Sequence, residues 1–177
     1  MKKIALISTF CDTNEKIQVL LNNVKILKSL GVDVMVNSPI PFDSTLTSYF
    51  DFYFQTKENP VLTWPDRVMA HWKIYKDSFG KETKMVRGLK DYGWAALYQI
   101  KKLSEIALTF NYDIFYHVTY DLYIDSKIIE DISNNEFNVI YPVRTEHGVW
   151  PASPVFCSFN KDNLKNISSD IKYEEYI

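Results

Sequence analysis

The sequence predicts an α/β fold in which a mostly parallel central sheet has helices on both faces. Residues 4–36 have the pattern of a strand, a helix and a second strand, and residues 94–120 have that of a helix leading into another buried strand. Hydrophobic residues make up 46% of the 177 residues, enough to build one sizeable core. We therefore expect a single domain spanning residues 1–177.

The first predicted unit contains two strands and the helix between them. Residues 4–9 have the composition of a central strand, and Asp12 followed by Glu15 has the spacing of a capping pair at a helix start. Apolar residues then recur every three or four positions until Gly31, which is placed to end the helix. Because residues 32–36 predict another strand, the two strands should be parallel with a right-handed crossover between them.

A third strand and a long irregular stretch come next. Pro39 and Pro41 force a turn, residues 42–49 allow at most a short helix, and residues 50–54 predict a strand. Periodicity is then lost between residues 60 and 92, and long excursions of this kind in compact domains are often functional.

Regular patterning returns with a helix over residues 94–110 and a buried strand over residues 114–120. Ser126 is placed to cap the helix that follows. The later elements that we expect are a helix over 126–132, strands over 136–143 and 154–159 with a loop at 144–151 between them, a helix over 161–167 and a frayed polar tail.

Composition argues against several classes of protein. The formal net charge of −2 and a pI of about 5.9 argue against a general nucleic-acid binder. Only Cys11 and Cys157 are available, so we expect ordinary buried thiols and no disulfide framework or zinc site. No secretory signal follows Met1, and no apolar run approaches the roughly 20 residues that cross a bilayer, which predicts a cytoplasmic protein without an integral membrane segment. The many aromatic residues leave room for a homo-oligomer contact.

Polar residues follow the predicted strands at the edge where ligands bind in open α/β sheets. These residues are Thr9 with Phe10, Ser38, Asn59 and Asp121. Asp121 and then Asp125 follow a buried strand, and carboxylates in that position suit a divalent cation held against a phosphorylated ligand. The alternative is that Asp121 caps a turn or the next helix.

A second group of candidates precedes the helix at residue 94. Arg87 and Lys90 lie close to Tyr92 and Gly93, and an anion there would meet unpaired backbone N–H groups at the positive end of the helix dipole. We expect phosphates to bind here, although glycines before a helix are also common for structural reasons.

Histidines and an acidic loop residue are candidates for proton transfer. His117 lies mid-strand, and we interpret it as a core or sheet-face residue. Glu146 and His147, in a loop next to Trp150, could contact an acceptor or act as a general base, or could simply be solvated.

Common site motifs are absent, because the chain has no GxGxxG, Walker loop, GxSxG or HExxH. Dehydrogenase, P-loop and α/β-hydrolase functions are therefore disfavoured. A nucleoside diphosphate suits the residues that remain, with its base near Thr9 and Ser38, its phosphates near Arg87 and Lys90, and a metal ion bridging Asp121 to phosphate oxygens.

Three stretches resemble GT-A-type glycosyltransferases, most closely the family-2-like enzymes of bacteria and viruses. They are Ile4-Ala-Leu-Ile-Ser-Thr-Phe with its helix, Val36-Asn-Ser-Pro-Ile-Pro, and Gly93 opening a helix that ends in Asn111-Tyr-Asp before the strand to Tyr120-Asp121. The resemblance covers most of the chain to about residue 160. It implies a single Rossmann-like GT-A domain, a UDP- or GDP-sugar donor, Mn²⁺ or Mg²⁺, and sugar transfer to a hydroxyl of a glycan, a lipid-linked molecule or another acceptor.

The resemblance also suggests roles for individual residues. Thr9 and Ser38 fall where the family contacts the nucleoside, and Asp121 falls where its metal-binding DxD motif lies. Thr119-Tyr120-Asp121 keeps only the second aspartate, and the spacing of Asp125 would be unusual. Residues 1–121 would form the nucleotide-binding half and residues 122–177 a partial acceptor-side half, in which Glu146 is the nearest available base.

Two other functions fit the same residues. A sugar nucleotidyltransferase shares a similar half-fold but would want a glycine-rich loop after the first strand, where residues 8–12 contain no glycine. A non-catalytic module that binds nucleotide sugars fits the lone aspartate. The sequence leaves the donor sugar, the acceptor and the stereochemistry of transfer open.

Overall fold

The structure is a computed structural model, and it describes residues 1–58, 60, 62–63, 90–91, 93–135, 143–145, 148–150 and 156–170. Several predictions fall outside the described residues. They include most of the strand predicted over 136–143, of which residue 143 alone is described, most of the polar tail, and the site candidates Asn59, Arg87, Tyr92, Glu146 and His147.

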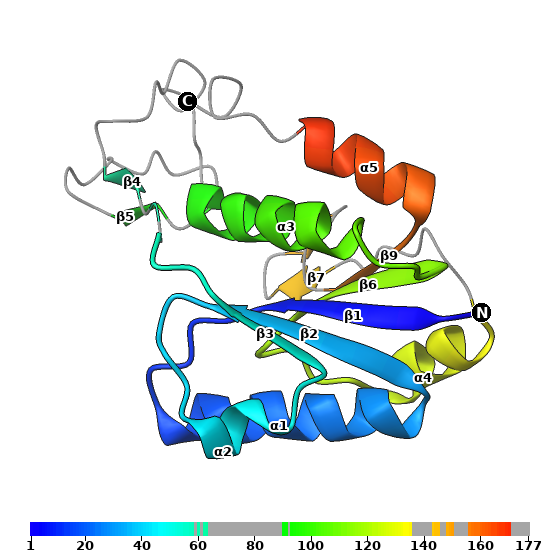
Figure 1. The fold of residues 1–177 in the computed structure, drawn as a ribbon, viewed down its shortest axis with the longest axis horizontal. Helices are drawn as coiled ribbons and strands as arrows, with labels where there is room; N and C mark the ends of the chain where they lie inside the picture. Colours follow the sequence, from blue (N-terminus) through cyan, green and yellow to red (C-terminus); the bar gives the residue numbers. More distant parts are fainter. Residues whose placement is uncertain are drawn as a thin grey trace.

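The described chain is built on a five-stranded sheet in the order β3-β2-β1-β6-β9 (Figure 1). Strands β1 (Lys3–Ser8), β2 (Val32–Ser38), β3 (Phe52–Gln55) and β6 (Ile114–Thr119) run parallel. Strand β9 (Phe156–Asn160) pairs antiparallel with β6 at one edge. The prediction of an α/β fold with a mostly parallel sheet is therefore confirmed.

Helices cover both faces of this sheet, as predicted. Figure 1 shows α1 (Asn14–Ser29), the short α2 (Ser44–Thr47) and α4 (Ser126–Ser133) on one face, with α3 (Gly93–Ala107) and α5 (Lys161–Asp170) on the other. No helix in the described ranges is long and apolar enough to cross a membrane.

Two separate antiparallel pairs complete the described elements. Strand β4 (Leu62–Thr63) pairs with β5 (Lys90–Asp91), and β7 (Val143–Thr145) pairs with β8 (Gly148–Trp150). The second pair lies where a loop was expected over residues 144–151, so that prediction was wrong. Strands of three residues are too short to show the alternation by which a strand is recognised in a sequence.

Each central strand contributes to two cores, because successive side chains point to opposite faces of a sheet. In β1, Ala5 and Ile7 belong to the core that includes buried residues of α1 and α4, whereas Ile4 and Leu6 belong to the core that includes residues of α3 and α5. Fully burying a side chain such as Leu27 of α1 stabilises the fold by roughly 1.5–3 kcal/mol. The sheet is therefore held from both sides.

The ends of the helices are fixed by caps, and two of these differ from the prediction. Thr13, not Asp12, caps α1, because its hydroxyl accepts a backbone N–H three residues on at 3.4 Å. Asp125, not Ser126, caps α4 through a backbone N–H at 2.9 Å. Both capping residues have the extended backbone that an N-cap requires, and neighbouring candidates cannot be separated on residue type alone. Gly31, with a φ of +70°, follows α1 as predicted.

The order of the strands positions the functional site. The chain builds β1, β2 and β3 toward one edge, then returns through α3 to place β6 on the other side of β1. The strand order therefore reverses between β1 and β6. In open α/β sheets, ligands bind in the crevice outside the carboxyl ends of the strands at such a reversal.

Candidate functional site

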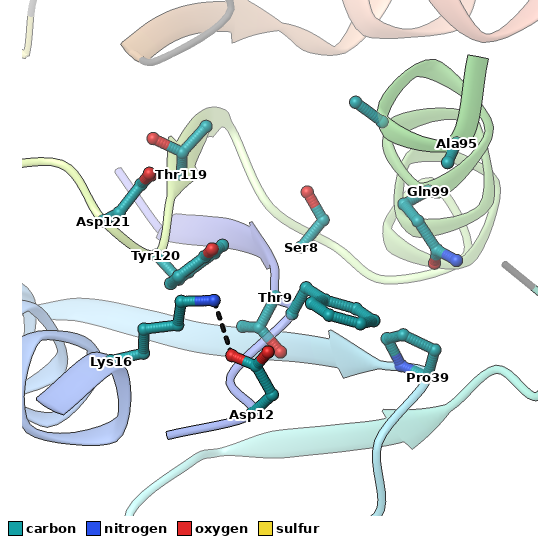
Figure 2. Close-up of a pocket in the computed structure, with 12 residues that line it drawn as sticks. Ser8, Thr9, Asp12, Lys16, Pro39, Ala95, Gln99, Thr119, Tyr120 and Asp121 are labelled. Carbon is teal, nitrogen blue, oxygen red and sulfur yellow. Dashed lines mark hydrogen bonds and ion pairs between the residues drawn. The ribbon is translucent and has the colours of Figure 1, made fainter. Parts of the chain in front are cut away.

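A cavity of about 520 Å³ lies outside the carboxyl ends of β1 and β6 (Figure 2). The segment after β1, the first turn of α1, Pro39 after β2, the first half of α3 and the end of β6 all contribute to its lining. The cavity thus occupies the position that the reversal of strand order predicts for a ligand.

Three of the site residues expected from the sequence line this cavity. Thr9 is 5% exposed, and its hydroxyl donates to the backbone oxygen of Asn37 at 3.3 Å. Phe10 is 40% exposed and presents an aromatic ring to the cavity. Asp121 lies just after β6 and is exposed. Thr9 and Phe10 follow β1, and Asp121 follows β6. These two strands are neighbours in the sheet although paired residues such as Leu6 and His117 are 111 positions apart in the sequence, so the three side chains meet at one site.

Other candidates take structural positions. Ser38 is fully buried, and its hydroxyl donates to the backbone oxygen of Ile40 at 2.7 Å, which stabilises the turn after β2. Asp125 uses Oδ1 to cap α4. Lys90 lies in β5, and Gly93 begins α3. The predicted nucleoside contact of Ser38 stays a prediction, and in this structure its hydroxyl is engaged in the turn.

An ion pair between Asp12 and Lys16 lines the cavity and was not assigned to the site from the sequence. The Lys16 ammonium lies 2.5 Å from Asp12 Oδ1 and 5.8 Å from the centre of the Phe10 ring. The hydrogen bond between the two side chains lowers the pKa of Asp12 and raises the pKa of Lys16, so both are charged at neutral pH. The four-residue spacing predicts that the two side chains can pair where the helix begins. It does not predict that the pair faces the cavity.

The end of β6 contributes Thr119, Tyr120 and Asp121. Among the described residues, none forms a hydrogen bond or ion pair with the Asp121 carboxylate, and Thr119 Oγ1 is buried without a partner. Burial, with the nearby charge of Asp121, raises the pKa of Tyr120, so its hydroxyl remains a hydrogen-bond donor at neutral pH. A buried polar atom without a partner costs free energy. A ligand that hydrogen-bonds Thr119 would recover part of that cost.

Asn23 of α1 fixes the loop that carries Asp121. Its side chain is 1% exposed, and its Nδ2 donates to the backbone oxygens of Tyr120 at 3.2 Å and Leu122 at 2.7 Å. These bonds hold the backbone on both sides of Asp121. An asparagine on the buried face of a helix was the signal for this role, because a buried amide requires partners.

A second buried network fixes the wall that α3 contributes. Asn37 Nδ2 donates to Gln99 Oε1, and Gln99 Nε2 donates to the backbone oxygen of Glu58 at 2.9 Å. The Thr56 hydroxyl donates to Asn37 Oδ1 at 2.7 Å. The Tyr98 hydroxyl donates to the Glu58 carboxylate, a hydrogen bond that raises the pKa of Tyr98 to about 12. The network joins α3 to the ends of β2 and β3, which sets the width of the crevice.

His117 and the two cysteines behave as buried structural residues, as predicted. His117 is 4% exposed, its Nδ1 lies 3.3 Å from the backbone oxygen of Leu6, and burial lowers its pKa to about 4. Cys11 and Cys157 are both buried and unbridged, and burial raises their pKa to about 12 and about 11. The ring of His117 is therefore neutral, and both thiols are protonated, at neutral pH.

A divalent cation at this site would need oxygens from a ligand. Within the described ranges, no group of three or more His, Cys, Asp or Glu side chains could hold a metal ion. Asp121 alone presents a carboxylate to the cavity without a described partner. Mg²⁺ commonly binds through one or two carboxylates together with substrate phosphates and water, so a single aspartate fits a cation that arrives with a phosphorylated ligand.

Comparisons of the chain with protein-family models, with curated proteins and with solved structures found no match.

Proposed function

We propose that the protein is a metal-dependent glycosyltransferase of GT-A type. It would bind a UDP- or GDP-sugar in the cavity and transfer the sugar to an acceptor hydroxyl. The observation that carries this proposal is the Asp121 carboxylate, which faces a cavity at the reversal of strand order and has no described partner. The resemblance of the stretches around residues 4–10, 36–41 and 93–121 to glycosyltransferases supplies the class of reaction.

The cavity has the size and surfaces that a nucleotide needs. Its volume of about 520 Å³ falls within the range of roughly 300–1,000 Å³ of small-molecule sites. Phe10 offers an aromatic face on which a base can stack, and Gln99 is held in one orientation by its two hydrogen bonds. A preorganised lining of this kind binds without first having to become ordered.

Asp121 would hold Mn²⁺ or Mg²⁺ together with diphosphate oxygens of the donor. When bound, the ion neutralises the negative charge that develops on the nucleoside diphosphate as its bond to the sugar breaks. Asn23 keeps the Asp121 loop in place, and Tyr120 can donate a hydrogen bond to a ligand oxygen. Asp125 is left out of this assignment, because one of its oxygens is engaged in the cap of α4.

The test combines thermal melting with donor turnover. We expect one class of sugar nucleotide to raise the melting temperature with Mn²⁺ but not with EDTA. Ligand at about 100 times its dissociation constant stabilises the folded state by about 2.7 kcal/mol. Asp121→Asn should abolish this gain and reduce release of the nucleoside diphosphate by about 100-fold or more, the loss typical when one electrostatic contact to developing charge is removed.

Asp162→Asn is the matched control, because this aspartate is also exposed but lies in the first turn of α5. It should bind and turn over the donor as the wild type does. If no sugar nucleotide shifts the melting temperature in any condition, the proposal is wrong. Metal-dependent binding without turnover in the presence of simple sugar acceptors would instead favour a non-catalytic binding module.

A further inference from the structure

Lys16 is the one cationic side chain in the described lining of the cavity, where it accompanies the carboxylates of Asp12 and Asp121. A diphosphate placed there would add at least two negative charges to a surface whose described side chains already carry one net negative charge. Coulomb repulsion would oppose that binding unless cations approach the phosphates. A metal ion on Asp121 is one such cation, and Lys16 is the other that the lining offers.

The geometry leaves Lys16 able to change partner. Its ammonium is paired with Asp12 at 2.5 Å, and the two side chains are 37% and 46% exposed. Ion pairs at such exposure contribute little to stability, so exchanging one partner for another costs little. An ammonium has three N–H donors on a flexible stem, so it can approach a phosphate without leaving its place over Phe10.

Lys16 also lies on the side of the cavity where Asp121 is found. Figure 2 shows its side chain extending from α1 toward Tyr120, with the dashed line joining it to Asp12. Lys16, Tyr120 and Asp121 all line this cavity. An anion bound beside Tyr120 would therefore have both a lysine and an aspartate in the lining around it.

We propose that Lys16 binds a phosphate of the ligand and that Asp12 competes for the same ammonium when the cavity is empty. The inference rests on the proposed function, because it names the residue that recognises the diphosphate of the donor. The site would then recognise two parts of the nucleotide with two different residues. Phe10 faces the base, which is common to a nucleoside and its diphosphate, whereas Lys16 responds only to the phosphates.

The two roles predict opposite effects for the two partners. Lys16→Met removes the cation and should weaken binding of a nucleoside diphosphate by about tenfold or more, without changing the affinity for the corresponding nucleoside. Lys16→Arg should retain most of the affinity, because it keeps the charge. Asp12→Asn removes the competing carboxylate and should tighten binding of the diphosphate several-fold.

The experiment measures dissociation constants by calorimetry in EDTA for inorganic pyrophosphate, for UDP and GDP, and for the matching nucleosides uridine and guanosine. Lys25→Met is the control, because Lys25 is an exposed lysine on the same helix that does not line the cavity. We expect Lys16→Met to lose pyrophosphate binding and Lys25→Met to keep it, with unchanged melting temperatures in both.

Three outcomes would overturn the assignment of Lys16: equal binding of pyrophosphate by the two methionine variants, no binding of millimolar pyrophosphate by the wild type, or weaker binding by Asp12→Asn. The pyrophosphate probe separates this inference from the proposed function. If pyrophosphate binds through Lys16 while no sugar nucleotide binds, the anion site stands and the glycosyltransferase proposal fails. If a sugar nucleotide binds equally to wild type and Lys16→Met, the glycosyltransferase proposal stands and the assignment of Lys16 fails.

Discussion

The sheet has a cavity at each end, and the two cavities differ in how their polar groups are satisfied. The cavity at the carboxyl ends of β1 and β6 contains an unpartnered hydroxyl on Thr119 and a carboxylate on Asp121 without a described partner. The other cavity, of about 350 Å³, lies at the amino ends of β1 and β2 and includes Lys2, Asp33 and Tyr112 in its lining. There, Tyr112 and Asp33 hydrogen-bond to each other, and the backbone N–H of Lys2 hydrogen-bonds to the adjoining turn.

Two contacts show the difference at the amino end. The Tyr112 hydroxyl donates to Asp33 Oδ2 at 2.6 Å, and the backbone N–H of Lys2 donates to Asp113 Oδ2 at 2.7 Å. Burial and the bond to Asp33 raise the pKa of Tyr112. A hollow between loops is therefore insufficient evidence of a ligand site. Polar groups that have found partners stabilise the fold, whereas a group without a partner in the lining of a cavity is a candidate contact for a ligand.

His117 extends this comparison to the interior, because it lies on β6, the strand that precedes Asp121. Its ring is buried against the backbone oxygen of Leu6, and its pKa of about 4 lies below the unfolded value of 6.5. Between these values the unfolded chain binds a proton that the folded chain excludes. The stabilisation is therefore complete above pH 6.5 and is lost as the pH falls toward 4.

We expect His117 to remove about 2 kcal/mol of stability between pH 7.5 and pH 5.0. Urea unfolding of the wild type and of His117→Gln at the two pH values measures this difference. The variant can be less stable at both, but the drop between them should be smaller by about that amount. An identical drop in both proteins would show that His117 does not exclude the proton.

Replacing one tyrosine in each cavity tests the difference between the two cavities directly. Tyr112→Phe removes a hydrogen bond at the amino end and should cost roughly 0.5–1.5 kcal/mol of unfolding free energy, with no effect on nucleotide binding. Tyr120 has no hydrogen bond from its hydroxyl to any described residue, so Tyr120→Phe should change stability by less than about 0.5 kcal/mol and weaken nucleotide binding. Denaturant unfolding and calorimetry on both variants make the test. The comparison fails if Tyr112→Phe is the variant that loses ligand affinity.

Much of the fold was predictable because its signals are local and periodic. The two strands and the helix between residues 3 and 38 follow from their composition and from apolar spacing, and Gly31 marks the end of α1. The direction of β9 was not predictable. Residues 156–160 show that a strand is present, but its antiparallel pairing with β6 depends on the path of the chain between them.

The candidate site was predictable only in part. Thr9 and Asp121 could be placed because they follow strands, and parallel strands bring their carboxyl ends to one edge. Lys16 and Gln99 could not, because their positions depend on which face of each helix is turned to the crevice. The burial of Ser38 was not predictable for a related reason, since the direction of a side chain at a strand end depends on register.

The finest test of the comparison replaces one hydroxyl at a time with a methyl group. Thr119→Val removes a buried hydroxyl that has no partner among the described residues, so stability should stay the same or rise slightly, while affinity for the nucleotide falls several-fold. Thr9→Val removes a hydroxyl that donates to Asn37, and it should cost about 1 kcal/mol. Both residues line the same cavity, so unfolding and binding measurements on the pair separate a hydroxyl that stabilises the fold from one that has no partner in it. A loss of stability in Thr119→Val equal to that in Thr9→Val would mean that the Thr119 hydroxyl is already bonded in the folded protein, and that an unpaired group is no guide to this site.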